Sequence, residues 1–107
     1  MDKETVIESI KQIAQQVLPK GSAVYLYGSR ARGDYHEDSD WDLLVLLDKT
    51  ENSRDDWDKY AWPFTEMGWN LNEDISARTF TKNYWYNGPH SMFFFNVEED
   101  KHLIYES

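Results

Sequence analysis

The amino-acid sequence predicts an α/β fold in which a small mixed β-sheet packs with helices. Apolar residues at helical spacing alternate along the chain with short runs of β-forming residues, an order typical of sheets covered by helices. The run Leu43–Leu47 is apolar at every position, as expected of a central strand buried on both faces. A length of 107 residues is about that of one domain, so we expect a single domain over residues 1–107.

The first half of the chain predicts a long helix, two strands and a tight turn between the strands. Apolar residues recur at helical spacing over residues 3–17, with charged residues on the opposite side. The run AVYLY at residues 23–27 is rich in β-forming residues and stops at Gly28, and a turn or short helix opens at Ser29. After a polar loop, residues 40–47 form the predicted central strand.

The second half of the chain predicts further helices and a third strand. Pro63 should kink or split the first of these helices, and Thr81 is a suitable N-cap for the next. We expect the helices to cover one face of the sheet. In chain order, the predicted segments are a helix over 53–67, a strand over 70–80, a helix over 82–87, a helix over 90–96 and a terminal strand or extension over 102–105.

Composition and charge limit the class of protein. The net charge of −9 makes nucleic acid an unexpected partner, because proteins that bind it usually neutralise phosphates with a basic surface. The longest apolar run, Leu43–Leu47, is far shorter than the roughly 20 residues of a membrane span, and no secretory leader pattern opens the chain. The absence of cysteine excludes disulfides and thiolate zinc sites, which suits a cytoplasmic protein. From these features together we expect a soluble, cytoplasmic protein without a membrane partner.

Two aspartates open the predicted central strand. In Asp40-Trp41-Asp42 the two carboxylates share a face, because residues two apart in a strand point the same way, roughly 6 to 7 Å apart. Two such charges repel each other and resist burial. A hard dication bound by both removes this conflict, and Mg²⁺ is typically held by one or two carboxylates together with substrate phosphates and water. The pair therefore predicts a magnesium site.

A second motif lies just before this pair in the chain. A strand that ends at Gly28 and opens a helix at Ser29 presents backbone N–H groups and a hydroxyl to an anion, with no Cβ at Gly28 to block its approach. Arg30 and Arg32 can add charge-assisted contacts to phosphate oxygens, although either could instead pair with acidic residues of the following loop. The motif therefore predicts a phosphate-binding turn.

A two-metal transfer reaction needs one more carboxylate to hold the second ion. The predicted third strand offers Glu73 and Asp74, and neighbouring strands lie about 4.8 Å apart, within reach of the pair. Only one of these two side chains can share the face of Asp40 and Asp42. The alternation of apolar residues does not choose between them.

The spacing of the two motifs resembles the nucleotidyltransferase superfamily that includes DNA polymerase β. Gly28-Ser29 is followed, after ten residues, by Asp40-x-Asp42, the G-S-x(10)-D-x-D pattern. The fuller strings GSRARG and SDWDLLV are similar to the minimal nucleotidyltransferases of bacteria and archaea, which are about as long as this chain. The resemblance is strong over residues 25–47 and weaker over residues 73–85. It implies the polymerase-β-like nucleotidyltransferase fold.

The resemblance also implies an activity and its ligands. Members transfer a nucleoside monophosphate from a nucleoside triphosphate to a hydroxyl and release pyrophosphate, and we expect AMP from ATP with a protein or small-molecule acceptor. Two Mg²⁺ ions would be held by Asp40, Asp42 and a third carboxylate. Asp74 best matches that third position and would also assist as base, while Glu73 stays open, because no apolar-Asp-apolar pattern surrounds the site.

The remaining expectations concern phosphate binding and partners. By the same resemblance, Gly28 and Ser29 hold the terminal phosphates, and Arg30 and Arg32 stabilise phosphate charge. Minimal members are often encoded beside a small helical partner of the HEPN type, where they resemble antitoxins that modify the partner by adenylylation. The alternative is a non-catalytic antitoxin that only retains nucleotide binding. The seventeen aromatic residues hint at a covered face, such as the interface of a homo-oligomer.

Overall fold

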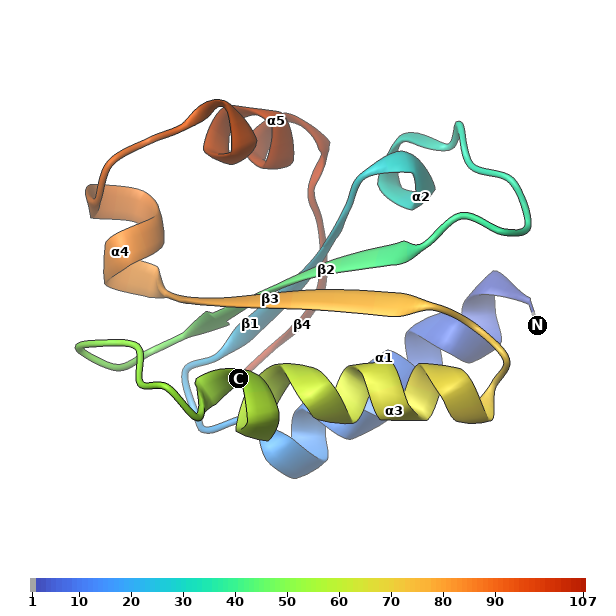
Figure 1. Cartoon of the computed structure of the whole chain (residues 1–107), viewed down its shortest axis with the longest axis horizontal. Coiled ribbons are helices and arrows are strands. Elements are labelled where there is room, and N and C mark those ends of the chain that lie inside the picture. Colours follow the sequence, from blue (N-terminus) through green and yellow to red (C-terminus); the bar gives the residue numbers. More distant parts are fainter. Residues whose placement is uncertain (1) are drawn as a thin grey trace.

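The computed structural model describes residues 2–107 and contains a four-stranded mixed sheet with the strand order β3-β2-β1-β4 (Figure 1). Strand β1 is antiparallel to both of its neighbours, whereas β2 and β3 run parallel. The predicted mixed sheet is therefore confirmed, and the final segment is its edge strand. The strands are β1 (Ala23–Tyr27), β2 (Trp41–Leu47), β3 (Ile75–Thr81) and β4 (His102–Glu106).

One face of the sheet is covered by α1 (Lys3–Val17) and α3 (Trp62–Asn70), which lie side by side below the strands in Figure 1. The apolar stripe predicted for α1 is buried, and its first turn is capped by Asp2, whose carboxylate accepts a hydrogen bond from the Thr5 N–H at 2.8 Å. These helices share a core with the alternate residues of β2 that begin at Trp41. Its largest fully buried members include Trp41, Phe64, Ile10, Leu43 and Leu47.

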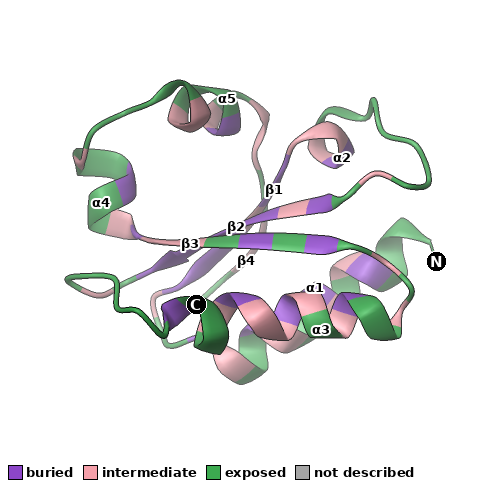
Figure 2. Ribbon diagram, viewed as in Figure 1, coloured by how far each residue is buried: buried purple, intermediate pink, exposed green. Residues whose placement is uncertain are grey.

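Helices α4 (Lys82–Asn87) and α5 (Met92–Asp100) lie on the opposite face of the sheet, so the expectation that helices cover one face alone is wrong. The cause is visible in β2, where Leu44 and Leu46 point away from α1 and α3 and need a cover of their own. Trp85 of α4 and Val97 of α5 bury them in a second, smaller core. Figure 2 accordingly shows buried residues along the strands and on the inner sides of helices on both faces.

Several element boundaries differ from the predicted ones. The helix expected from Ser53 begins later, as the π-helix η1 (Trp57–Ala61). The Asp56 carboxylate accepts the Ser53 N–H at 2.8 Å and holds the residues before η1 in a turn. Pro63 lies where η1 passes into α3, as its lack of an N–H favours. Strand β3 begins at Ile75 rather than residue 70, and α5 continues to Asp100.

The turn between β1 and β2 contains the short helix α2 (Ser29–Arg32). In Figure 1, α2 and the loop that follows it lie beyond the end of β1, between β1 and the start of β2 and away from α4. Two residues of α2, the buried Arg30 and the partly buried Ala31, pack against the core that α1 and α3 cover. Among residues 2–107, no helix has the length and apolar character needed to cross a membrane.

Candidate functional site

The Gly28-Ser29 motif and the aspartate pair meet at one end of the β1–β2 hairpin. Tyr27, the last residue of β1, is paired with Asp42 in the antiparallel register, so the chain turns into α2 beside the Asp42 side chain. Gly28 is the N-cap of α2 and has a φ of 75°, a conformation that residues with a Cβ rarely adopt. The strand-to-helix turn predicted from the sequence is thus built as expected.

Gly28 also makes room for Asp42. A Cβ placed at Gly28 would overlap the Oδ2 atom of Asp42, so the carboxylate lies directly against the backbone at the start of α2. The first N–H groups of a helix have no acceptor within the helix. Ser29 is the first residue of α2, so its hydroxyl is close to these N–H groups in the chain. The carboxylate predicted to bind metal and the turn predicted to bind phosphate are therefore adjacent.

The two aspartates interact electrostatically. Partial burial raises the pKa of Asp42, and the nearby charge of Asp40 raises it further, while Arg78 and Arg32 act in the opposite direction. Burial and the charge of Asp42 also raise the pKa of Tyr27 to about 12. Asp42 is partly buried and Asp40 is exposed, and a cation bound by both carboxylates would relieve the repulsion between them.

Arg30 holds the loop that precedes β2. The residue is only 7% exposed, and its Nη2 donates hydrogen bonds to the backbone carbonyls of Ser39 at 3.0 Å and Glu37 at 3.2 Å. The guanidinium lies 4.5 Å from the ring centroids of both Tyr35 and Trp41. Arg30 therefore points toward Trp41, which belongs to the face of β2 opposite Asp42, and not toward the carboxylate pair where phosphate is expected.

Arg32 forms the ion pairs that the sequence left open as an alternative to phosphate binding. Its Nε lies 3.2 Å from Asp34 Oδ2, and its Nη1 lies 2.9 Å from Asp100 Oδ2. The second pair joins α2 to the end of α5. Since the side chain is 46% exposed and its charge lowers the pKa of Asp42, Arg32 borders the site while already carrying two carboxylate partners.

The structure separates the two candidates for the third carboxylate. Glu73 faces Trp41, whose Nε1 donates to Glu73 Oε2 at 3.3 Å, and the same oxygen lies 4.0 Å from Arg30 Nη2. Asp74 is exposed and lies just before β3, with its backbone carbonyl accepting the Trp41 N–H at 2.9 Å. Within residues 2–107, no three carboxylate or histidine side chains are placed to hold a metal ion together. The structure thus shows no three-carboxylate cluster among these residues, and the metal-ligand roles of Asp40, Asp42 and Asp74 stay predictions.

Strand β3 places a hydroxyl and a guanidinium beside Asp42 instead. In the parallel register Ser76 pairs with Asp42 and Arg78 pairs with Leu44, so Ser76 and Arg78 share the face of Asp42. The Arg78 guanidinium lies 4.7 Å from the centroid of the Phe93 ring on α5. Sequence reasoning did not select Arg78, although its even spacing from Asp74 already placed it on the same face of the predicted strand.

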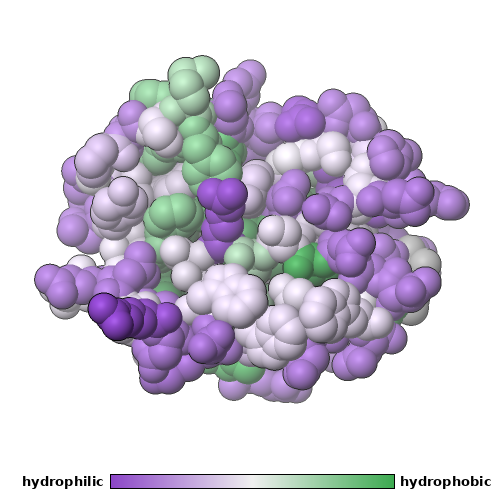
Figure 3. All heavy atoms as spheres, viewed as in Figure 1, coloured by the Kyte–Doolittle hydropathy of each residue, from purple (hydrophilic) through white to green (hydrophobic). Residues whose placement is uncertain are grey.

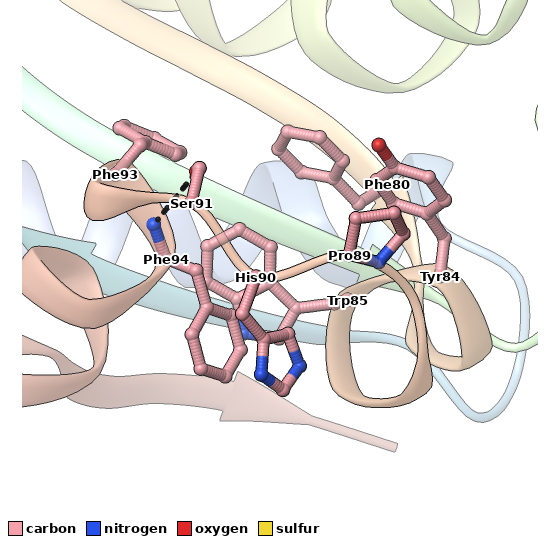
Figure 4. Close-up of a pocket in the computed structure, with 8 residues that line it drawn as sticks. All are labelled: Phe80, Tyr84, Trp85, Pro89, His90, Ser91, Phe93 and Phe94. Carbon is pink, nitrogen blue, oxygen red and sulfur yellow. Dashed lines mark hydrogen bonds between the residues drawn. The ribbon is translucent and has the colours of Figure 1, made fainter.

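An aromatic pocket lies farther along the same face. Figure 4 shows side chains of α4 and of the segment leading into α5 around it, with His90 stacked on Phe94 at a centroid distance of 3.7 Å. The cavity holds about 210 Å³. Phe93 forms part of its wall and also contacts Tyr27, with 5.7 Å between ring centroids, so the pocket adjoins the aspartate site. In Figure 3 hydrophobic side chains gather over α5 accordingly.

A comparison with protein families matches residues 8–107 to the family described as polymerase beta, nucleotidyltransferase. The chain belongs to the polymerase β nucleotidyltransferase family. The match includes both motifs and all four strands, so the fold expected from Gly28-Ser29 and Asp40-x-Asp42 is confirmed. A search of curated protein sequences finds no match.

Several solved structures share this nucleotidyltransferase fold. A chain in the crystal structure of a toxin-antitoxin with AMP-PNP superposes with a TM-score of 0.67 and 18% identity, covering 94% of this chain and 73% of that one. A chain in the complex of tri-AMPylated Shewanella oneidensis HEPN toxin with MNT antitoxin gives 0.64 and 15%, covering 99% and 74%. A putative nucleotidyltransferase from Sulfolobus solfataricus gives 0.62 and 23%, covering 96% and 82%.

Magnesium, which the nucleotidyltransferase family implies, fits part of this site. Asp40 and Asp42 supply two adjacent oxygen donors that repel each other, a donor set suited to one Mg²⁺ shared with substrate phosphates. The set for a second ion is incomplete, because Asp74 and Glu73 do not join the pair in a cluster within the described residues. The donor set thus supports one metal ion and leaves the two-metal arrangement without its third carboxylate.

Proposed function

We propose that this nucleotidyltransferase transfers a nucleoside monophosphate, AMP from ATP, to a hydroxyl group of a protein or small-molecule acceptor. The observation that carries the proposal is the contact between Asp42 and the backbone at Gly28, which joins a carboxylate pair to a phosphate-binding turn. Family membership supports the reaction class, and a toxin-antitoxin relative was crystallised with an ATP analogue.

Each part of the site takes a role in this proposal. The Ser29 hydroxyl and the backbone that follows Gly28 hold the terminal phosphates, because helix-opening N–H groups attract anions. Asp40 and Asp42 would hold Mg²⁺, which, when bound, polarises the phosphoryl oxygens and neutralises developing charge. Arg30 keeps the loop before β2 in place and so positions Asp40, while Arg32 adds positive charge at the rim of the site.

The reaction exchanges one phosphorus–oxygen bond for another. The acceptor hydroxyl oxygen attacks the α-phosphorus, and the bond from that phosphorus to the oxygen bridging to the β-phosphorus breaks. Pyrophosphate leaves with the electron pair of the broken bond, and the hydroxyl proton passes to water. The protein contributes mainly by alignment of the two oxygens and by electrostatic stabilisation, as in phosphoryl transfer generally.

We propose that the acceptor is a small helical protein of the HEPN class. The support is the likeness to chains of two toxin-antitoxin structures, one of which holds an AMPylated HEPN toxin with its MNT antitoxin. The strong negative charge of this chain, −9, suits a basic partner surface. Transfer of AMP would then neutralise the partner.

The test is transfer of label from ATP carrying ³²P at the α-phosphate. The chain is mixed with Mg²⁺ and a candidate protein of the HEPN class, and labelled protein is separated from free nucleotide. We expect the partner to be labelled with release of pyrophosphate, and labelling to fall at least 100-fold in Asp42→Asn, as for the loss of a major electrostatic group. Undiminished labelling by Asp42→Asn would contradict the proposed site.

A second candidate is a non-catalytic antitoxin that binds its partner and retains only nucleotide binding. The observation in its favour is that, among residues 2–107, no three carboxylate or histidine side chains are placed to hold a metal ion together. The double variant Asp40→Asn/Asp42→Asn separates the two candidates. If neutralisation works by contact alone, the variant still protects cells from the partner, whereas loss of protection with an intact complex favours catalysis.

A further inference from the structure

The face of β3 beside Asp42 lacks the carboxylate that a second metal ion would need, and a basic residue stands there instead. Ser76 is the neighbour of Asp42 in the register, and Arg78 is the next residue on that face. Neighbouring strands about 4.8 Å apart and a two-residue step of about 6.6 Å place the Arg78 Cα roughly 8 Å from the Asp42 Cα. An arginine side chain spans that distance.

Arg78 differs from the other two arginines of the site in what surrounds its charge. Arg30 is buried beneath its loop, and Arg32 carries two carboxylate partners. Arg78 is exposed, and among residues 2–107 no carboxylate oxygen forms an ion pair with it within the 4.0 Å that defines such pairs. In a chain with 20 acidic and 11 basic residues, this leaves a full positive charge available to a ligand at the site.

Phe93 fixes the position of this guanidinium without neutralising it. The 4.7 Å contact between the guanidinium and the ring is a cation–π interaction, which restrains the side chain while its N–H donors stay free to bind oxygen at their edges. Phe93 is itself held against Tyr27, the residue before Gly28. The charge of Arg78 also acts on the pKa of both Asp42 and Tyr27, which supports its position over the site.

We infer that Arg78 binds the α-phosphate of the nucleotide and supplies there the positive charge that a second metal ion would bring to a three-carboxylate site. This inference rests on the proposed nucleotidyltransfer at Asp40 and Asp42. The guanidinium donates charge-assisted hydrogen bonds to the non-bridging oxygens of the phosphorus that is attacked. Those oxygens gain negative charge as the acceptor oxygen approaches and pyrophosphate leaves, so the contact strengthens in the transition state. The site accordingly works with one metal ion.

The experiment counts metal ions and measures nucleotide affinity, so neither readout depends on turnover. Mn²⁺ is titrated by electron paramagnetic resonance into the chain saturated with a non-hydrolysable ATP analogue. The affinity for this analogue and for adenosine is then measured for the wild type, Arg78→Gln and Arg78→Lys. Arg54→Gln is the matched control, because it removes the same charge from an exposed position in the loop between β2 and η1.

We expect one Mn²⁺ per chain and a loss of triphosphate affinity of about 10- to 100-fold in Arg78→Gln, the range for losing hydrogen bonds to a charged group. Arg78→Lys should recover part of the affinity, Arg54→Gln should stay within about twofold of the wild type, and adenosine binding should not change. Equal melting temperatures of the wild type and the Arg78 variants would show that loss of the contact with Phe93 does not displace α5.

Four results would overturn the inference. Two Mn²⁺ ions per wild-type chain would show that the second metal is present after all. Wild-type affinity in Arg78→Gln, or an equal loss of adenosine and triphosphate binding, would show that Arg78 does not bind phosphate, and the proposed function would survive. Failure of the wild type itself to bind the triphosphate would remove the proposed function and this inference together.

Discussion

The Oδ2 atom of Asp42 occupies the space that a side chain at Gly28 would fill. This contact connects the end of β1 with the start of β2 and places a carboxylate against the opening of α2. It explains why the G-S and D-x-D motifs, which are separate in the sequence, lie together in the fold. It also makes the glycine a requirement of the site as well as of the turn.

Gly28→Ala should therefore impair nucleotide binding in addition to stability. The backbone conformation with a φ of 75° costs a residue with a Cβ roughly 1 to 3 kcal/mol, and the new methyl group displaces the Asp42 carboxylate. Gly33→Ala is the control, since Gly33 has a φ of 90° but no atom within 4 Å of a built Cβ. Calorimetric binding of Mg²⁺-ATP should fall in Gly28→Ala alone, and an equal fall in both variants would refute the role of the contact.

Asp42→Asn should stabilise the ligand-free protein while abolishing activity. Burial and then the charge of Asp40 raise the pKa of Asp42, so the ionised form costs stability at neutral pH. That cost appears as the pH rises from the ordinary aspartate pKa through the raised one, and the asparagine avoids it. We expect a gain of roughly 1 kcal/mol near pH 7, the size of an exposed charge interaction.

The comparison of thermal unfolding at pH 7 and pH 3 tests this expectation for Asp42. The gain should be present at pH 7 and absent at pH 3, where the wild-type carboxyl is protonated in both the folded and the unfolded chain. The exposed loop residue Asp38, changed to asparagine, provides the control. A destabilised Asp42→Asn at pH 7 would show that the carboxylate is held by favourable partners rather than strained by repulsion.

Asp56 should stabilise the start of η1 through its buried carboxylate. It is 2% exposed and accepts from Lys49 Nζ at 2.8 Å and from the Ser53 N–H and hydroxyl, each at 2.8 Å. Burial alone would raise the pKa of Asp56, but these hydrogen bonds outweigh it and the pKa is lowered. Asp56→Asn should cost about 2 kcal/mol, because Lys49 loses its partner. The nearby exposed Asp58 offers a control substitution of the same kind.

The sign of the pH dependence follows from the lowered pKa of Asp56. Its stabilisation is complete above the ordinary aspartate pKa of about 3.9 and is lost as the pH falls through the lower folded-state value. Denaturant unfolding of the wild type and Asp56→Asn should therefore differ at pH 7 and converge in strong acid. A difference that persisted undiminished at pH 2 would mean that the lost stability comes from packing instead.

Arg30→Lys should lower the affinity for nucleotide although Arg30 is remote from the Asp42 face. A lysine keeps the charge but cannot bridge the carbonyls of Glu37 and Ser39 while stacking between two rings. We expect a loss of about 1 to 2 kcal/mol in stability and greater mobility of the loop that carries Asp40. Hydrogen exchange of residues 34–40 would report this mobility, and unchanged exchange with weakened binding would favour direct contact with phosphate.

Much of the fold was predictable from the sequence because local signals and tertiary packing agree. The stripe over residues 3–17, the run at residues 23–27 and the cap at Thr81 each form the predicted element. The second layer of helices was missed, since apolar runs near the end of the chain do not reveal which face they cover. The apolar residues on both faces of β2 were the signal that two layers were needed.

The part of the site whose residues are close in the chain was predictable from the sequence. The part that depends on which residues of β3 lie beside Asp42 was less predictable. Gly28 and Asp42 meet because a single hairpin joins them, as their spacing suggested. The choice between Glu73 and Asp74, and the place of Arg78, depend on a parallel pairing between strands separated by two helices. A one-residue slip of that register would exchange the two faces of β3, and no local pattern excluded it.

The most direct test of the account is the metal dependence of ATP binding. Calorimetric titration of ATP into the chain, with Mg²⁺ and with EDTA, is compared between the wild type and Asp40→Asn/Asp42→Asn. We expect tight binding by the wild type only with Mg²⁺, and weak binding by the variant in both conditions. The account would be contradicted by equal binding of ATP with and without Mg²⁺, or by equal binding to the wild type and the variant. Either result would show that a metal ion bound with the triphosphate does not offset the repulsion between Asp40 and Asp42.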